Sequence, residues 1–254
     1  MQIVIIGSGN VATHLAKEMQ LNNFKIAQVY SNTLENAKQL ASELKASYTN
    51  EIKNINSDAD LYIIAIKDSE VKNLVSNLKI SDNRLIVHTS GSLNIDILSG
   101  FNNYGVVYPL QTFNKNIPLN FKEIPFCIEA NSLENEEKLF NIFKKISDNT
   151  LKIDSLKRGK LHLSAVFACN FTNYMYNIAN EILQESEIDF SILKPLIKQT
   201  ATKLNYGLPS KMQTGPAIRN DINIISKHLL MIENEKYKEI YKLISNSISE
   251  DLHK

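Results

Sequence analysis

The first twelve residues constrain the fold of this chain more than any other stretch. Residues 2–6 read QIVII, four of them apolar and β-branched, and predict a buried strand. Gly7-x-Gly9-x-x-Ala12 follows at once, and a helical pattern comes next. Strand, tight turn and helix in this order are the setting of the dinucleotide-binding fingerprint, in which the small residues allow the turn, the approach of a pyrophosphate and close helix packing. The alternative is a glycine turn that has lost its ligand.

The composition argues against several classes of protein. The 254 residues carry a net charge of +1, so no basic field points to nucleic acid as a partner. No apolar run is long enough to cross a membrane, and a strand that starts at residue 2 leaves no room for a signal peptide. Cys127 and Cys169 lie far apart in apolar surroundings, and each is expected to be a buried free thiol. We therefore expect a cytoplasmic protein.

Strand and helix patterns alternate through the first half of the chain. The strands expected after the first are residues 26–30, 61–66, 85–88, 105–108 and 126–129. The helices between them are expected to be capped by Asn32 with Glu35 as a capping box, by Asp68 or Ser69, and by Ser132. Such alternation predicts an α/β fold with a doubly wound parallel sheet of the Rossmann type.

The pattern changes near residue 152, after which no strand is expected. One long helical pattern covers residues 156–186, a second covers 189–205, and further helices follow a loop at 206–216. We predict a dinucleotide-binding domain over residues 1–152 and an all-α domain over 153–254. Because the long helix carries more apolar surface than so small a domain readily covers, we expect a homodimer through the helical domain.

Four stretches of the chain resemble one protein family. They are His88-Thr-Ser-Gly-Ser92, Tyr108-Pro-Leu-Gln-Thr-Phe113, residues 162–173 (HLSAVFACNFTN), and Thr214-Gly-Pro-Ala-Ile-Arg-Asn-Asp221 with His228. Together with the fingerprint at the start, they resemble the Rossmann-like and DUF2520 oxidoreductase family. This family lies within the superfamily of 6-phosphogluconate dehydrogenase, ketopantoate reductase and pyrroline-5-carboxylate reductase. The resemblance covers nearly the whole chain and implies an NADP oxidoreductase with a helical second half.

The end of the second expected strand favours NADP over NAD. NAD-binding sites usually place an Asp or Glu there for the ribose 2′-OH, whereas this strand ends in Tyr30-Ser31-Asn32-Thr33 and the first acid is Glu35. Neutral donors suit a 2′-phosphate, although NADP-linked relatives commonly offer an Arg where this chain has Asn32. The same three polar residues also fit a role as helix caps.

Further cofactor contacts are implied by the resemblance, which places the loops after residues 61–66 and 85–88 beside the nicotinamide and its ribose. Both loops leave strands at their carboxyl ends, where open α/β sheets bind ligands. The complete set of expected cofactor-binding residues is Gly7, Ser8, Gly9, Asn10, Val11, Ala12, Ser31, Asn32, Thr33, Ile66, Lys67, Ser69, Thr89 and Ser90.

Candidate proton-transfer groups lie near the start of the long helix. On an ideal α-helix, Asn173 is ~20° and Asn170 ~80° around the axis from His162, so all three can share one side. Related β-hydroxyacid dehydrogenases present a Lys and an Asn four residues apart, a spacing that Lys160 and Asn170 do not match. We therefore expect His162 to donate or accept the proton and Asn170 to orient the substrate. The alternative for His162 is a hydrogen-bonded core residue.

Several other candidates have both a functional and a structural interpretation. His88 either takes part directly or is a hydrogen-bonded structural histidine. Arg219 and Asp221 are expected in the first turn of a helix, where Arg219 either holds a substrate carboxylate or pairs with Asp221. The expected substrate-binding residues are Gln111, Asn173, Thr214, Arg219 and Asp221. The five histidines show no ligand spacing, so no metal is expected.

Two functions from different classes fit these features. The first is an NADP-dependent oxidoreductase that moves a hydride to or from a small carbonyl or imine compound. The second is a non-catalytic dinucleotide sensor that binds a partner through its helical half. A polar pocket with His162 and Asn170 at the nicotinamide end would favour the enzyme.

Overall fold

The computed structural model of the protein describes residues 1–251. The chain forms two compact units, Met1–Cys169 and a second unit that starts at Asn170. The first contains all the strands of the described chain, and the second is helical. Each unit has its own architecture.

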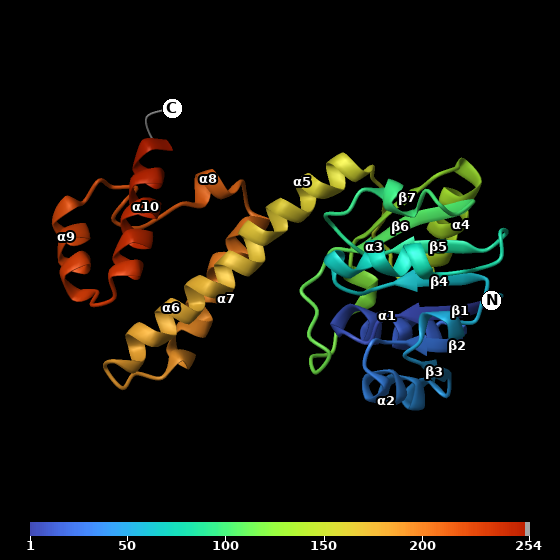
Figure 1. Cartoon of the computed structure of the whole chain (residues 1–254). Coiled ribbons are helices and arrows are strands. Elements are labelled where there is room, and N and C mark those ends of the chain that lie inside the picture. Colours follow the sequence, from blue (N-terminus) through green and yellow to red (C-terminus); the bar gives the residue numbers. More distant parts are fainter. Residues whose placement is uncertain (252–254) are drawn as a thin grey trace. The chain divides into compact units, whose positions relative to one another are not determined.

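An eight-stranded sheet in the order β3-β2-β1-β4-β5-β6-β7-β8 forms the centre of the first unit (Figure 1). The strands are β1 (Gln2–Ile6), β2 (Lys25–Tyr30), β3 (Ser47–Thr49), β4 (Leu61–Ile64), β5 (Leu85–His88), β6 (Asn103–Pro109), β7 (Phe126–Ala130) and β8 (Thr150–Lys152). This mostly parallel sheet confirms the predicted fold class. β7 is antiparallel to β6, because the intervening chain holds only the short 3₁₀ helix Phe121–Glu123 and no crossover helix.

Four helices of the first unit cover the two faces of the sheet: α1 (Asn10–Leu21), α2 (Leu34–Leu44), α3 (Asp68–Asn77) and α4 (Leu133–Phe143). The unit also contains α5 (Ser155–Ala165) and short 3₁₀ helices at Ile52–Asn54 and Ile95–Leu98. Successive side chains of β1 enter different layers: Ile3 and Ile5 join the cluster that includes α1, α2 and α4, and Val4 and Ile6 join the cluster that includes α3. Burial on both faces explains why the central strands are continuous apolar runs.

The second unit consists of α6 (Thr172–Gln184), α7 (Lys194–Thr202), α8 (Pro209–Met212), α9 (Ile222–Met231) and α10 (Glu235–Asp251). Short 3₁₀ helices, Phe190–Leu193 and Lys203–Asn205, flank α7. The long helix predicted over residues 156–186 forms, but a π-helical segment, Val166–Phe171, lies between α5 and α6 within it. Because a π-helix bonds i to i+5, the angles calculated for ideal α-helical spacing do not apply across it.

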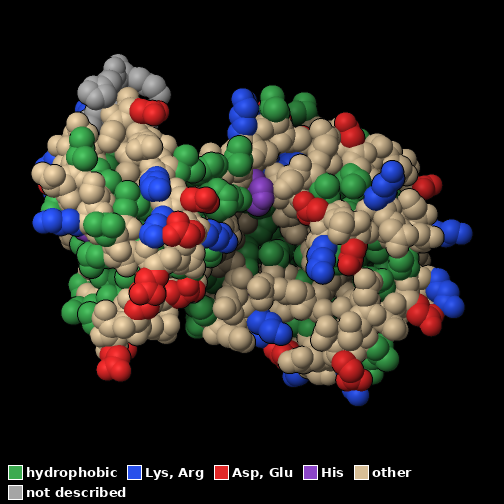
Figure 2. Space-filling view, turned by 60° about the vertical axis from the view of Figure 1, so that its left-hand side comes forward, with side chains coloured by type: hydrophobic (Ala, Val, Ile, Leu, Met, Phe, Trp, Pro, Cys, Tyr) green, Lys and Arg blue, Asp and Glu red, His purple; other side chains and the backbone are tan. Residues whose placement is uncertain are grey.

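The segment before α9 also differs from the prediction. α8 forms inside the expected loop, and α9 starts at Ile222 because Gly215 and Asn220 adopt positive φ angles of 114° and 51° and turn the chain. Among the described residues of this unit, Ala217 and Ser245 alone are buried. Hydrophobic side chains are visible over its surface in Figure 2. Within residues 1–251, no helix has the length and apolar character needed to span a membrane.

Candidate active site

A cleft of about 830 Å³ lies at the edge of the sheet where β1, β2, β4 and β5 end. The glycine turn forms one wall. Gly7 has a φ of +130°, and a Cβ there would lie 2.2 Å from the Ala65 carbonyl oxygen, so only glycine fits. A Cβ on Gly9 would meet no atom within 4 Å, which leaves its backbone open to a ligand at the start of α1. These features fit a bound pyrophosphate.

Most of the predicted cofactor-binding residues line this cleft. The lining residues among them are Gly7, Ser8, Gly9, Asn10, Val11, Ser31, Asn32, Thr33, Ile66, Lys67, Thr89 and Ser90. Ala12 is buried in the core beneath the turn, and Ser69 is exposed on α3 outside the lining. Sequence reasoning missed Asn36, Leu40 and Glu43, although their spacing of three and four residues places them on one face of α2.

The end of β2 forms a hydrogen-bonded corner of the cleft. Ser8 Oγ and Ser31 Oγ lie 2.8 Å apart, and Asn32 accepts a hydrogen bond from the Tyr30 hydroxyl at 2.7 Å. The Asn32 amide donates to Glu70 at 3.0 Å. The predicted capping box is therefore wrong: Thr33 is the N-cap of α2, without a side-chain bond. A carboxylate reaches this corner after all, from α3, and burial together with Glu70 raises the pKa of Tyr30.

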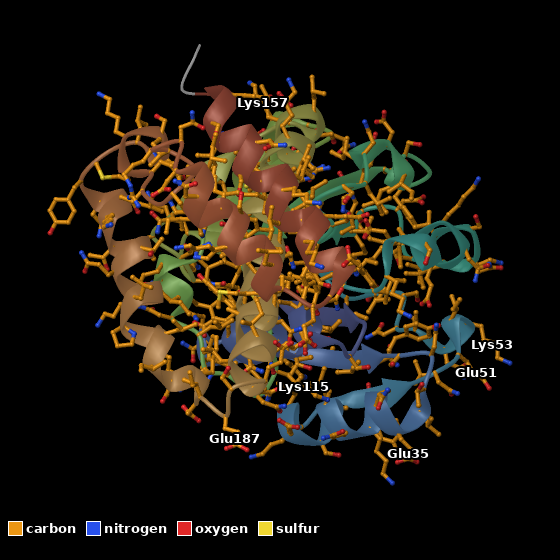
Figure 3. All side chains as sticks on the ribbon, turned by 90° about the vertical axis from the view of Figure 1, so that its left-hand side faces the viewer. Glu35, Glu51, Lys53, Lys115, Lys157 and Glu187 are labelled. Atoms are coloured by element: carbon orange, nitrogen blue, oxygen red, sulfur yellow. The ribbon has the colours of Figure 1, made fainter. Side chains whose placement is uncertain are left out.

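A loop from far along the chain closes another side of the cleft. Lys115, labelled in Figure 3, lies in the segment between β6 and β7 and lines the cleft. Its backbone N–H donates to the Asn10 side chain at 3.2 Å, and His14 Nε2 bonds to the Asn114 carbonyl at 2.8 Å. These bonds hold the backbone of residues 114–115 near the start of α1. No local pattern in the sequence connects Asn10 with a residue 105 positions later.

The loop after β5 is organised by a buried histidine. His88 is 1% exposed, and its Nδ1 accepts a hydrogen bond from the Ser90 N–H at 3.2 Å. Burial, and next the Arg158 cation, lower the pKa of His88 to about 4, so the ring is neutral at physiological pH. Ser90 Oγ donates to Asp68 at 2.7 Å, which explains why neither Asp68 nor Ser69 caps α3 as expected. This geometry favours the structural interpretation of His88.

His162 lies directly beside this loop. A Cβ built on Gly91 would be only 2.6 Å from His162 Cγ, so the ring packs against the Gly91 backbone, next to the cleft-lining Ser90. His162 Nδ1 and the Tyr108 hydroxyl are 2.9 Å apart, and the two rings meet edge to face at 5.8 Å and 79°. Burial, and next the Cys127 thiol, raise the pKa of Tyr108 to about 12, so this side chain remains a neutral phenol.

A buried ion pair anchors the helix that carries His162. Arg158, in α5, is 1% exposed and pairs with Glu129 of β7. Ser155 Oγ donates to Glu129 at 2.8 Å and accepts from the Arg158 guanidinium at 3.0 Å. Because Arg158 precedes His162 by one helical turn, this cluster determines where His162 lies. Sequence reasoning missed Tyr108, Arg158 and Glu129 as site residues. Tyr108 did carry a signal, since it begins one of the four stretches that resemble the family, but nothing local distinguishes Arg158 and Glu129 from other polar residues.

The remaining predicted residues are not among those that line the cleft. Gln111 is exposed after β6 and bonds its own neighbour, the Thr112 N–H, at 2.8 Å. Asn170 and Asn173 are exposed, in the π segment and in α6 respectively. Thr214 lines an apolar cavity of about 270 Å³ inside the second unit.

The expected positions of Arg219 and of one cysteine are wrong. Arg219 is exposed in the turns before α9, whereas Asp221 is the N-cap of that helix and accepts from the Ile224 N–H at 3.2 Å. Cys127 is buried as predicted, but Cys169 is exposed in the π segment. No group of three potential metal ligands is found among the described residues.

The glycine turn, the cleft at the carboxyl edge and the adjacent imidazole–phenol pair define a dinucleotide-binding oxidoreductase. Two family profiles match the chain: "NADP oxidoreductase coenzyme F420-dependent" over residues 2–91 and "Domain of unknown function (DUF2520)" over residues 124–248. A Bacteroides fragilis protein, provisionally named an NADP oxidoreductase, is 43% identical over 98% of both chains, with a TM-score of 0.95. The chain belongs to this family of NADP oxidoreductases with a DUF2520 domain, and its cofactor is NADP.

More distant structures share the fold alone. A Thermotoga maritima protein is 20% identical, with a TM-score of 0.79 over 98% of this chain and 99% of its own. A reductive aminase from Aspergillus terreus, solved with NADPH and ethyl-5-oxohexanoate, is 11% identical, with a TM-score of 0.73 over 99% and 93%. No curated protein matches the sequence. Membership in the family supports the enzyme rather than the sensor that the sequence left as an alternative.

Proposed function

We propose that this oxidoreductase transfers a hydride between NADP and a small carbonyl or imine compound. One observation carries the proposal: His162, whose imidazole can give or take a proton, packs against Gly91 beside the cleft-lining Ser90. Reduction of C=O or C=N needs one proton for each hydride, so a proton donor beside the cofactor cleft fits this chemistry. The fold-level likeness to a reductive aminase adds support by analogy.

The roles of the cleft residues follow from their positions. Gly7, Gly9 and the free N–H groups at the start of α1 would hold the pyrophosphate, with the Lys115 ammonium close by. The hydroxyl and amide groups of Ser31 and Asn32 would hold the 2′-phosphate. NADPH, when bound, supplies the hydride. The residues of this chain would bind NADPH, exclude water from one side of it and present the proton to the substrate.

We assign His162 as the acid and Asn170 as the group that orients the substrate, the roles expected from the sequence. In the reductive direction, protonated His162 gives its Nε2 proton to the substrate oxygen or nitrogen as hydride arrives at carbon. The N–H bond breaks, the O–H or N–H bond forms, and the ring is left neutral. Asn170, from the π-helical segment, is proposed to orient the substrate through its amide, and π segments are frequent at functional sites.

Turnover of NADPH with a panel of small aldehydes, ketones and cyclic imines tests this function. We expect His162→Gln to lower turnover by about 10²–10⁴-fold and Asn170→Ala by less, with NADPH affinity unchanged. His228→Gln is the matched control, because His228 forms an equivalent pair with Tyr241 in the second unit at 2.8 Å. Equal turnover in His162→Gln and the unsubstituted protein would exclude His162 as the acid.

We further propose that two copies associate through their helical units. The described residues from Asn170 onward include only two buried side chains, whereas Leu196, Leu230 and Leu243 are 63%, 86% and 69% exposed. An apolar surface of this extent is typical of an interface that another chain covers. Light scattering should report about twice the 28.8 kDa of one chain at micromolar concentration. A mass of one chain would refute the dimer.

A further inference from the structure

The Tyr108 hydroxyl has one hydrogen-bond partner among the described residues, and that partner is His162. The tyrosine stands near the carboxyl end of β6 and is 8% exposed. Its hydroxyl lies 2.9 Å from His162 Nδ1, and the residues described show no other bond to this hydroxyl and none to His162 Nε2. A buried hydroxyl is stable when it is hydrogen-bonded, so the bond to Nδ1 is expected to persist.

We propose that Tyr108 is a positioning residue for the reaction: its hydroxyl holds Nδ1 of His162 and so leaves Nε2 as the nitrogen that exchanges a proton with the substrate. This inference rests on the proposed role of His162 as the acid. It extends that role by naming the nitrogen that acts and the group that orients it.

The chemistry of the pair is consistent in both protonation states. In the neutral ring, Nδ1–H donates to the Tyr108 oxygen and Nε2 carries the lone pair that accepts a proton. In the imidazolium, Nδ1–H donates to the Tyr108 oxygen and Nε2–H is free to donate to the substrate. When the Nε2 proton leaves, Nδ1–H keeps its bond to Tyr108, so the ring does not rotate during the transfer. The hydroxyl oxygen, with its two lone pairs, accepts this bond in both states.

The surroundings prevent the pair from separating. Gly91 lies against the His162 ring so closely that a Cβ would be 2.7 Å from Nδ1. Tyr108, the other member of the pair, lies opposite Cys127 in the antiparallel β6–β7 pairing. The Arg158–Glu129 pair holds α5 on β7, the same strand that flanks Tyr108. Both partners are therefore attached to one rigid sheet, which suits a precise donor geometry.

A spectroscopic test examines the pair without any substrate. In protein labelled with ¹⁵N-histidine, His162→Gln identifies the two His162 ring nitrogens among the signals of five histidines. At alkaline pH, where imidazoles are neutral, we expect Tyr108→Phe to move the Nδ1 signal toward that of an unbonded ring nitrogen. Tyr104→Phe removes a hydroxyl from the same strand and should leave both signals unchanged. Unchanged His162 signals in Tyr108→Phe would overturn the inference.

Kinetics then separate this inference from the proposed function. With a substrate that the panel identifies, Tyr108→Phe should lower kcat by about 10- to 100-fold and leave the KM for NADPH unchanged. Thermal melting shows whether the variant stays folded, and Tyr241→Phe is the control from the second His–Tyr pair. A large loss in His162→Gln with full kcat in Tyr108→Phe refutes the positioning role alone. Full kcat in His162→Gln refutes the proposed function itself.

Discussion

The two units of this protein contain similar amphipathic helices but differ in how much of their apolar surface is covered. In the first unit, Leu15, Leu40 and Leu139 are buried to 3% exposure or less against the sheet. In the second, α6, α7, α8 and α9 contain no buried side chain. A sheet with two apolar faces covers its own helices within one chain, whereas a few helices without a sheet leave their apolar faces exposed.

The two units therefore depend on different sources of stability. Burial of apolar side chains is the dominant favourable term in folding, so the first unit is stable through contacts within one chain. The second unit needs further burial, which the proposed second copy would supply. Unfolding of the first unit should therefore be independent of protein concentration, and unfolding of the second should depend on it.

The largest expected effect concerns the buried ion pair of the first unit. Arg158→Met removes the partner of Glu129 and leaves a carboxylate without a counter-charge, which should cost about 3–5 kcal/mol of unfolding free energy. Urea denaturation measures the change. Arg84→Met, at a more exposed arginine paired with Asp58, should have little effect. Equal losses in both variants would show that the Arg158 cluster does not anchor α5.

The next effect is a pH dependence within the same unit. His88 has a pKa of about 4 in the folded protein and an ordinary value of 6.5. Between pH 6.5 and 4 the unfolded chain binds a proton that the folded chain does not, so stability should fall as pH is lowered, by on the order of 3 kcal/mol in total. His88→Gln should lose this slope. If urea titrations at pH 7, 6, 5 and 4 give the same slope in both proteins, His88 is not the group responsible.

A pair of glycine variants distinguishes fold from ligand binding. Gly9→Val places a side chain into open space, so the fold should survive while NADPH affinity falls by at least about 100-fold, or about 2.7 kcal/mol. Gly7→Val collides with the Ala65 carbonyl at a φ of +130° and should destabilise the first unit itself. The chain has no Trp, so NADPH fluorescence reports binding cleanly. Retained NADPH affinity in Gly9→Val would contradict the pyrophosphate site.

The smallest expected effect concerns exposed leucines in the two units. Leu230, in α9, and Leu21, in α1, are 86% and 76% exposed in the single chain. If a second copy covers the helical unit, Leu230→Gln should weaken association by about 1.5 kcal/mol, or roughly tenfold, while Leu21→Gln leaves it unchanged. Sedimentation across a dilution series measures both. Identical association in the two variants would mean that α9 lies outside the interface.

Much of the fold could be predicted from residue patterns alone. The strand–glycine–helix opening and the continuous apolar run at 61–66 predicted a parallel sheet, because strands buried on both faces require such runs. The spacing of Gly7 and Gly9 also predicted the turn that forms the cleft. Features of low sequence contrast were missed: β3 and β8 have three residues each, and nothing in residues 166–171 distinguishes a π-helix from an α-helix.

The candidate site was predictable only where it is local. The glycine turn and the ends of the strands are short segments, so consecutive residues determine their chemistry. Within the described residues 1–251, twelve of the fourteen predicted cofactor-binding residues line the cleft. The predicted roles of side chains that bond distant partners were wrong. Asn32 and Asp68 looked like helix caps, but Tyr30, Glu70 and Ser90 bind them instead, because tertiary hydrogen bonds outcompeted local ones.

Residue patterns were enough to predict the class of fold, the glycine turn and the lack of an acid at the end of β2, since each depends on residues close together in the chain. Folding alone brings Tyr108 to His162 across 54 residues and Arg158 to Glu129 across 29. The direction of β7 and the start of α9 were decided in the same way. The physical reason is that hydrogen bonds and ion pairs depend on distances of a few ångströms, which folding sets between residues that no local pattern connects.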